Sequence, residues 1–313
     1  MIYIIGHLKP DLDSAVSAVS LKYLFDQAAS FEHPNAQAVL ASEANFETQT
    51  IFSKYGFTTP LVLNKENIKP DDTFILVDHN ETSQRLEGIT NDQIIEIIDH
   101  HKISLNLSSP IYILIYPWGS TNSLIWWMMK RYDIKPDKNL ASLMISAILS
   151  DTVGFKSPTT TKVDKLFVDQ LNQIAHIENL NDLTYEILKA KSNLSGLTPK
   201  QILTKDYKIY KFNKHKILIN QVETADQESL LKNSDTLIKE MANLKKEVQL
   251  SWLVSVITDI FKINSKAIIL PEDERWLIKA FPQAKKIKTG VYDLGPIMSR
   301  KKEIVPQIEK VFI

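Results

Sequence analysis

The sequence contains no cysteine and only eight glycines among its 313 residues. The absence of cysteine excludes disulfide scaffolds, thiolate metal sites, iron–sulfur clusters and cysteine nucleophiles. The scattered glycines form neither the G-x-G-x-x-G nor the G-x-x-x-x-G-K-[ST] pattern, so neither common nucleotide-binding loop is present. A protein of this composition that handles phosphate must therefore do so with metal ions and cationic side chains.

Long apolar runs are also missing. No stretch approaches the ~18 uninterrupted apolar residues of a membrane span, and the N-terminal segment lacks the basic region and the longer apolar run of a signal peptide. We therefore expect a cytoplasmic protein with no membrane partner. The composition, with 44% hydrophobic and 24% charged residues, is that of an ordinary globular protein, and the length suits two domains.

The net charge of zero conceals a division of charge along the chain. Residues 1–194 have a net charge of −7, and residues 195–313 have a net charge of +7. Such a division is typical of a cation site in one half and an anion site in the other. Chance segregation of solvated surface charges would give the same numbers.

The first half alternates short apolar runs with longer segments of helical patterning. The runs lie at 2–5, 37–40, 73–77, 94–98 and 111–116, and the helical segments lie at 14–29, 45–55, 122–132, 140–149 and 162–174. Runs that are apolar at nearly every position are typical of buried parallel strands. We predict an α/β domain, residues 1–191, with a doubly wound and mainly parallel sheet whose ligand site lies beyond the carboxyl ends of the strands.

A segment containing serine, glycine and proline follows, and residues 192–198 are the predicted linker and hinge. Beyond it, strand-like runs at 207–212, 217–222, 252–257 and 267–270 flank one long predicted helix at 226–246. This pattern predicts a smaller α+β domain with a mixed sheet, residues 199–313, and an active site in the cleft between the two domains. The lysine-rich segment 285–288 is expected to be solvated surface.

Histidines and carboxylates gather at four places in the first domain. Three clusters, at 6–14, 77–81 and 98–102, follow predicted strands, and the fourth, at 149–152, closes a predicted helix. Because parallel strands deliver their carboxyl ends to one edge of the sheet, three of the clusters should converge. Imidazole with carboxylate suits Mn²⁺, Co²⁺ or Zn²⁺, and so many acidic ligands suit two ions about 3.5–4 Å apart.

Each cluster alone also has a purely structural interpretation. Asp13 stands where a helix N-cap is expected, Asp78 ends a strand where a turn former is common, and the pair His100–His101 could be packed or solvated. Four independent caps and turns explain the set less well than one shared metal site.

These motifs together resemble the DHH phosphoesterase superfamily, and within it the manganese-dependent, family II inorganic pyrophosphatases. The resemblance rests on the sequences at 6–14, 78–81, 99–101 and 150–152, on 155–159, and on Ser-Arg-Lys-Lys at 299–302, and it runs from His7 to Pro306. It implies hydrolysis of pyrophosphate to two phosphates by a metal-bridged hydroxide. It further implies two Mn²⁺ (or Co²⁺) ions per subunit, Mg²⁺ arriving with the substrate, and a homodimer formed through the first domain.

The resemblance also implies roles for particular side chains. The implied metal ligands are His7, Asp11, Asp13, Asp78, His100 and Asp151, and Asp78 would bridge the two ions. The implied substrate contacts are His101, which would also protonate the leaving group, Gln84, Lys205, Arg300 and Lys301. One departure is visible: Lys9 stands where the family usually has asparagine, and it brings a positive charge near the metals.

Other functions remain open from the residues. Exopolyphosphatases and other hydrolases of phosphoanhydrides or phosphodiesters share the superfamily plan. Oligonucleotide-cleaving relatives have a Gly-Gly-x-His segment in their second domain, whereas this chain has no adjacent glycines, so no nucleic-acid partner is expected. A binding protein without catalysis would have lost metal ligands, whereas all the implied positions are filled. Without the resemblance, residues 300–302 could be an ordinary basic helix surface.

Overall fold

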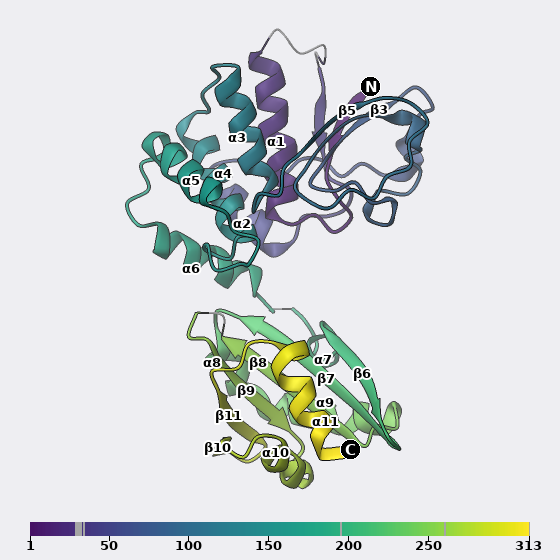
Figure 1. Ribbon diagram of the computed structural model, residues 1–313, viewed down its shortest axis with the longest axis vertical. Helices are drawn as coiled ribbons and strands as arrows, with labels where there is room; N and C mark the ends of the chain where they lie inside the picture. The colour runs from purple at the N-terminus through teal and green to yellow at the C-terminus, as the bar shows by residue number, and fades with distance from the viewer. Residues whose placement is uncertain (29–32, 34, 195, 260, 313) are drawn as a thin grey trace. The chain divides into compact units, whose positions relative to one another are not determined.

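The computed structural model describes residues 1–28, 33, 35–194, 196–259 and 261–312, with the side chains of Lys301 and Lys302 left out. The chain divides into two compact units, Met1–Lys191 and Ser192–Ile313 (Figure 1). Ala29 of the first predicted helix and Ser195 of the predicted linker lie outside the described residues. Among the described residues, none of the helices combines the length and the hydropathy that crossing a membrane would require.

The first unit contains a five-stranded parallel sheet. Its strands are β1 (Ile2–Ile5), β2 (Gln37–Val39), β3 (Thr73–Val77), β4 (Ile94–Asp99) and β5 (Tyr112–Ile115). Their order is β2-β1-β3-β4-β5, and every neighbouring pair is parallel. The predicted α/β class with a parallel sheet is confirmed, and all carboxyl ends lie at one edge.

The helices in the described part of this unit are α1 (Leu12–Gln27), α2 (Phe46–Lys54), α3 (Thr121–Arg131), α4 (Lys138–Asp151), α5 (Lys162–Ala175) and α6 (Leu180–Lys191). They share one apolar core with Ile75 and Val77 of β3. Phe74 and Leu76 point to the opposite face, as the two-residue period of a strand requires. That face is covered by connecting segments, which include the short 3-10 turns η1 (Lys65–Asn67), η2 (Thr82–Gln84) and η3 (Asn91–Gln93).

Helix α1 begins two residues earlier than the sequence pattern predicts, and this changes its cap. Asp11 is the N-cap, because its Oδ1 accepts a hydrogen bond from the Ser14 backbone N–H at 3.0 Å. Asp13 lies in the first turn and is only 1% exposed. The interpretation of Asp13 as the cap of its own helix is therefore wrong.

The second unit contains a six-stranded sheet. The sheet is mixed, as predicted. Its strands are β6 (Tyr207–Phe212), β7 (His215–Thr224), β8 (Trp252–Asp259), β9 (Asn264–Ile269), β10 (Lys285–Lys288) and β11 (Val291–Gly295). The order is β10-β11-β9-β8-β7-β6, and β7–β8 is the parallel pair. The helices are α7 (Pro199–Leu203), α8 (Gln227–Lys232), α9 (Ser234–Glu247), α10 (Glu274–Ala280) and α11 (Val305–Phe312), with short helical turns at η4 (Pro271–Asp273) and η5 (Arg300–Ile304).

Each face of this sheet has its own apolar core. Trp252 and Val254 pack with α10 and α11, and α11, drawn in yellow, lies across that face in Figure 1. Leu218 and Leu253 pack on the other face, with α9.

Two expectations for this unit need correction. The predicted helix over 226–246 is divided at Asn233, whose backbone (φ −95°, ψ 10°) interrupts the helix between α8 and α9. The segment 285–288 is exposed as expected, but it forms β10 at the edge of the sheet. Lysines on an edge strand oppose pairing with another chain, which explains a strand with so little apolar character.

Candidate metal centre

The six predicted metal ligands lie at five places in the first unit: after β1, at the start of α1, after β3, after β4 and at the end of α4. The structure brings them together. The potential ligand atoms lie within 4.8 Å of one another in three overlapping groups, which are His7–Asp11–Asp78, Asp13–His100–Asp151 and Asp78–His100–His101. Convergence at the carboxyl edge of the sheet, expected from the topology, is therefore observed.

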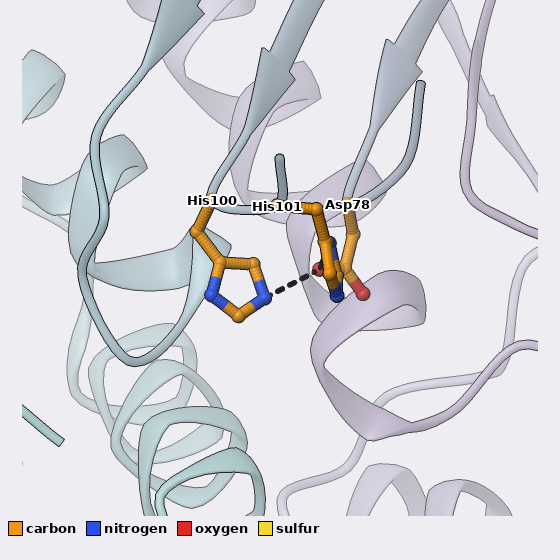
Figure 2. Close-up of side chains that lie close together, drawn as sticks. All are labelled: Asp78, His100 and His101. Atoms are coloured by element: carbon orange, nitrogen blue, oxygen red, sulfur yellow. Dashed lines mark ion pairs between the residues drawn. The ribbon is translucent and has the colours of Figure 1, made fainter. Parts of the chain in front are cut away.

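Asp78 lies at the centre of this arrangement. Its Oδ1 is 3.3 Å from His100 Nε2, and its Oδ2 is 3.5 Å from His7 Nε2. Figure 2 shows the His100 ring directed toward the Asp78 carboxylate, with His101 beside it. Asp78 has a left-handed backbone (φ 61°), which aspartate tolerates better than most residues. The two oxygens of one buried carboxylate thus face two different imidazoles.

The separations between these groups suit ligands that share a cation. Asp11 Oδ1 lies 3.6 Å from His7 Nε2, and Asp151 Oδ2 lies 3.3 Å from His100 Nε2. Ligands bound about 2.0–2.2 Å from a small divalent ion stand about 3.0–3.5 Å from one another. The observed spacing therefore leaves room for ions between the side chains.

His100 gives a further indication of metal binding. Its Nδ1 lies 2.9 Å from the carbonyl oxygen of Trp118, which orients the ring. Its Nε2 is buried and has no hydrogen-bond partner within the described part of the chain. An imidazole held through one nitrogen, with the other directed into a group of carboxylates, is typical of a metal ligand. The set of two imidazoles and four carboxylates fits a cation such as Mn²⁺.

The pKa values show how strongly the carboxylates crowd one another. Burial, with the charge of Asp78, raises the pKa of Asp13 well above its ordinary value and that of Asp151 to about 7. Burial alone would lower the pKa of His7 and His100, but the neighbouring carboxylates raise both to about 11. The imidazoles in turn lower the pKa of Asp78 in spite of its burial. The cluster therefore requires positive charge, which bound metal would supply.

Asp13 also stabilises a second helix. Its carboxylate accepts hydrogen bonds from the Ser120 hydroxyl at 2.5 Å, from the Thr121 backbone N–H at 2.8 Å and from the Asn122 side chain at 2.8 Å. These donors lie at the N-terminus of α3, where a negative charge is favoured by the helix dipole. No sequence pattern indicates these partners, because they lie more than 100 residues away from Asp13.

His101 is held by a residue to which the sequence assigned no role. Its Nδ1 lies 2.8 Å from Asp99 Oδ1, and Asp99 also accepts from the Asn80 side chain at 2.6 Å. The hydrogen bond to Asp99 raises the pKa of His101. The side chain of His101 is 48% exposed, so it is open to solvent beside the buried carboxylates. Asp99 and Asn80 both lie inside the recognised motifs, so their position offered a signal.

Gln84 and His79 lie close to this centre. Gln84 is exposed in η2. Its backbone carbonyl oxygen accepts a hydrogen bond from the Leu8 backbone N–H at 2.7 Å, so η2 lies against the segment after β1. His79 is buried, and burial lowers its pKa to about 4. It is a neutral residue that the predicted ligand set does not include.

Arg300 is the best defined of the predicted substrate residues in the second unit. It begins η5, a π-helical turn, and its Nη1 lies 2.8 Å from Asp206 Oδ1. Its backbone N–H donates to Gln221 Oε1 at 3.2 Å. Lys205 is exposed and directly precedes Asp206. Lys301 follows Arg300 in η5, and its side chain lies outside the described part of the structure.

Lys208 is a further basic residue, on β6, to which the sequence motifs assign no role. Side chains alternate between the faces of a strand, so Lys208 and Tyr210 point to the same face. The Lys208 ammonium lies 5.5 Å from the centre of the Tyr210 ring, and Tyr210 packs against the core that contains Ile304 of η5. Lys208 therefore shares the face of the sheet that η5 and α11 cover. Strand alternation was the signal that could have identified it.

Two family models match the chain. The DHH family N-terminal domain matches residues 1–148, and the DHHA2 domain matches residues 185–311. Together with the parallel sheet and the histidine and aspartate cluster, they define a two-domain enzyme of the DHH phosphoesterase superfamily.

Relatives that match over their full length show which family of the superfamily the chain resembles. The chain is 36% identical, over 100% of its length and 99% of the relative, to a manganese-dependent inorganic pyrophosphatase from Methanocaldococcus jannaschii. It is 34% identical to one from Methanothrix thermoacetophila, over 99% and 98% of the two chains. The chain belongs to the family of manganese-dependent (family II) inorganic pyrophosphatases, which confirms the resemblance seen in the sequence.

Solved structures agree with this assignment. A crystal structure from Methanococcus jannaschii assigned to the family II inorganic pyrophosphatases matches with a TM-score of 0.65 and 35% identity, covering 100% of this chain and 99% of that chain. An exopolyphosphatase-related protein from Bacteroides fragilis shares the fold, with a TM-score of 0.50 and 16% identity, over 99% and 91% of the two chains.

Proposed function

We propose that this enzyme hydrolyses inorganic pyrophosphate to two phosphates at a centre of two Mn²⁺ (or Co²⁺) ions per subunit. The observation that best supports the proposal is the convergence of the six side chains, Asp78 at their centre, with ligand atoms within 4.8 Å of one another in each group. In this proposal His7, Asp11 and Asp78 hold one ion, and Asp13, Asp78, His100 and Asp151 hold the other.

Asp78 is proposed as the bridge, because one of its oxygens faces His7 and the other faces His100. When bound, the cations supply a hydroxide nucleophile at neutral pH by lowering the pKa of water. The protein fixes the direction of the carboxylate: the Thr121 hydroxyl donates to Asp78 Oδ1 at 2.9 Å.

His101 is proposed to act on the substrate rather than on the metals. Asp99 holds the ring through Nδ1 and raises its pKa, which favours the imidazolium form with a proton on Nε2. This proton can be donated to a phosphate oxygen or to the oxygen that leaves when the anhydride bond breaks.

Cationic side chains are proposed to bind the anionic substrate. Arg300, Lys301 and Lys205 would supply positive charge to pyrophosphate, and Gln84 a polar contact. Mg²⁺ bound to the substrate would reduce its charge further. The exposure of Lys205 is consistent with such a role.

The function is tested by measuring phosphate release from pyrophosphate, tripolyphosphate and a dinucleotide, with Mn²⁺ and after chelation. We expect pyrophosphate to be the preferred substrate, chelation to abolish turnover and Mn²⁺ to restore it. Faster release from tripolyphosphate would indicate an exopolyphosphatase, and cleavage of the dinucleotide would indicate a phosphodiesterase. Mn²⁺-independent turnover would contradict the proposed centre.

We also propose a homodimer formed through the first unit. β5 is an edge strand of the parallel sheet, and its Tyr112 and Ile113 are 49% and 40% exposed. An edge with exposed apolar side chains is a ready site for strand pairing. Light scattering of the wild type and of Ile113→Lys tests this: the variant should be monomeric. The cytoplasmic location stays a prediction from the sequence.

A further inference from the structure

A polar network that the proposed ligands do not include lies directly beside Asp151. Ser150 is buried in the last turn of α4, and its hydroxyl donates to Glu47 Oε1 on α2. The ammonium of Lys191, the last residue of α6, donates to the Ser150 hydroxyl at 3.1 Å and to its carbonyl oxygen at 3.3 Å. Three helices thus meet at the residue that precedes a proposed metal ligand.

Glu47 is an unusual residue to find in this place. It is only 1% exposed, and its second carboxylate oxygen has no hydrogen-bond partner in the described part of the chain. Burial raises the pKa of Glu47, and the Lys191 ammonium and the Ser150 hydroxyl counteract this. Burying a carboxylate is costly for stability unless it is compensated. Neither the apolar core nor the proposed ligand set accounts for Glu47 at this position.

Lys191 fixes the end of a helix. Carbonyl groups in the last turn of a helix lack intrahelical N–H partners, and lysine side chains often bind them. The carbonyl oxygen of Ser150 accepts from the Val153 backbone N–H at 3.2 Å as well as from Lys191. Asp151 belongs to the same turn, so its backbone is held by these contacts.

The charge of Lys191 interacts with carboxylates of the metal centre. Desolvation lowers the pKa of Lys191, but the carboxylates of Glu47, Asp11 and Asp151, in particular, raise it by more. An ammonium this close to a cation site opposes metal binding by simple Coulomb repulsion. A role in positioning Asp151 would favour metal binding. The two effects have opposite signs, so they can be separated by experiment.

We propose that Lys191 and Glu47 are positioning residues of the metal centre, which hold Ser150 between them and so fix the direction of the Asp151 carboxylate toward its cation. The inference deepens the proposed function and rests on it only in that Asp151 ligates Mn²⁺.

The test is Mn²⁺ binding to the metal-stripped full-length protein, followed by the paramagnetic resonance of free Mn²⁺, which requires no turnover. Lys191→Met keeps most of the length of the side chain and removes its donors. We expect it to weaken Mn²⁺ binding about tenfold, as loss of a group that orients a ligand does. Lys191→Arg, which keeps a donor, should recover most of the affinity. Unchanged or tighter binding to Lys191→Met would show a charge effect only and would overturn the proposal.

Glu47 supplies an independent pair of variants. Glu47→Gln keeps an acceptor for the Ser150 hydroxyl and should bind Mn²⁺ within about threefold of the wild type, because the hydrogen bond is preserved. Glu47→Leu removes the acceptor and should weaken binding about as much as Lys191→Met. Equal effects of Gln and Leu would contradict a positioning role. In the double variant Glu47→Leu/Lys191→Met the losses should be less than additive, because both act through Ser150.

The chain offers a matched control on the same two helices. Lys54 of α2 and Glu186 of α6 form an exposed ion pair at 2.7 Å. Lys54→Met therefore removes a lysine and a contact between α2 and α6 without touching Ser150, and it should leave Mn²⁺ affinity unchanged. Circular dichroism and the melting temperature show whether each variant is folded. If Lys191→Met or Glu47→Leu does not fold, Lys191→Arg and Glu47→Gln are compared with the wild type instead. Their Mn²⁺ titrations should then give affinities close to the wild-type value, and a clear loss of affinity would contradict the proposal.

The outcomes also separate this inference from the proposed function. If Lys191→Met and Glu47→Leu hydrolyse pyrophosphate and bind Mn²⁺ with the wild-type affinity, the positioning role alone is overturned. Weakened Mn²⁺ binding in both variants, with no pyrophosphate hydrolysis by the wild type, would support the positioning role and overturn the proposed function. A wild-type protein that binds no Mn²⁺ would overturn both.

Discussion

The two regions to which function is assigned are built in different ways. In the first unit, His7, Asp78 and His100 stand at the ends of parallel strands, so the sheet itself gathers them. In the second unit, Arg300 begins a π-helical turn and Lys208 stands on the edge strand of a mixed sheet. Apart from β7 and β8, neighbouring strands there run in opposite directions, so the strand ends are not gathered at one edge. Its basic residues are organised by an individual contact, the pairing of Arg300 with Asp206.

This difference implies that the first region binds cations and the second binds the anionic substrate. The first region is a crowded group of carboxylates whose pKa values are strongly shifted, as expected for a cation site. The second has exposed or half-buried cations on an irregular framework, as expected for contacts with an anion. If the division is correct, substitutions in one region should alter metal binding, and substitutions in the other should alter substrate binding alone.

The largest effect is expected from Asp78→Ala. Because its carboxylate faces both His7 and His100, its loss should impair both metal sites and lower phosphate release on the order of 10³-fold or more. Mn²⁺ titration and a phosphate assay measure the two effects. Asp71→Ala, which removes an exposed aspartate of the same unit, should behave as wild type. A variant that lost activity but kept both ions would show that Asp78 does not bridge them.

The pH dependence of metal binding tests the electrostatics of the first region. In the metal-free protein the carboxylates raise the pKa of His7 and His100 to about 11, so both imidazoles are protonated at pH 7. Each must lose its proton to bind Mn²⁺, so affinity should rise with pH between 6 and 8, by about tenfold per unit for each proton released. Calorimetry in two buffers of different ionisation enthalpy counts the protons. Affinity that does not change with pH would contradict the protonated state.

The same shifts affect the stability of the metal-free fold. Because the pKa of His7 and His100 is raised above 6.5, protonation stabilises the folded state fully below that pH, and the contribution disappears as the pH rises toward 11. Asp151 acts in the same sense but at lower pH, since its pKa is raised to about 7 and its ionisation destabilises the fold as the pH rises from the ordinary aspartate range toward 7.

Arg300→Ala should separate the two regions most clearly. Loss of the guanidinium should lower kcat/KM for pyrophosphate about 10²-fold, because it would stabilise charge on the substrate. Mn²⁺ affinity should stay at the wild-type value, since the predicted ligands all lie in the first unit. Arg275→Ala, an exposed arginine on α10, is the matched control. Parallel loss of Mn²⁺ binding in Arg300→Ala would show that the regions are not independent.

Lys205 and Lys208 offer a smaller contrast within the second region. The resemblance indicates Lys205, whereas Lys208 shares the face of the sheet that η5 covers. We expect Lys208→Ala to raise the KM for pyrophosphate about tenfold and Lys205→Ala about threefold, in line with loss of a charge-assisted hydrogen bond. Steady-state kinetics on both variants decides the order. A larger effect of Lys205→Ala would favour the assignment from sequence.

The contrast between the regions also explains what could be predicted. Strands β1 and β3 have the predicted bounds because each is a continuous apolar run. The metal ligands follow from motifs that sit at strand ends, so a prediction of topology was enough to bring them together. The partners of Asp13 on α3 could not be predicted, because they depend on how two helices distant in sequence pack.

The second unit shows where sequence patterns give less information. β10 was missed because Lys285–Lys288 has no apolar face to bury. The break at Asn233 was missed because Leu230, Leu237 and Leu244 are all buried, and their spacing suits one continuous helix. In both places the outcome depends on local backbone geometry rather than on hydrophobic periodicity.

The smallest effect is expected at Lys9, in the segment between β1 and α1. Lys9 is exposed, and its backbone is left-handed (φ 55°), a conformation that costs most residues free energy but is tolerated by asparagine. This gives a physical reason for the asparagine usual in the family. Lys9→Asn should therefore raise the free energy of unfolding of the metal-free protein by about 0.5–1 kcal/mol.

The charge of Lys9 must be separated from its backbone. Lys9→Met removes the charge but has no preference for the left-handed region, so it should leave the unfolding free energy unchanged within about 0.3 kcal/mol, as a surface substitution does. Denaturant unfolding of both variants measures the difference. If Met and Asn stabilise equally, the cause is the lysine charge near the metal centre, and the gain should then shrink at high salt. If only Lys9→Asn stabilises the protein, the cause is the left-handed backbone at Lys9. The segment beside the carboxylates of the metal centre is then strained, and the asparagine usual in the family would relieve that strain.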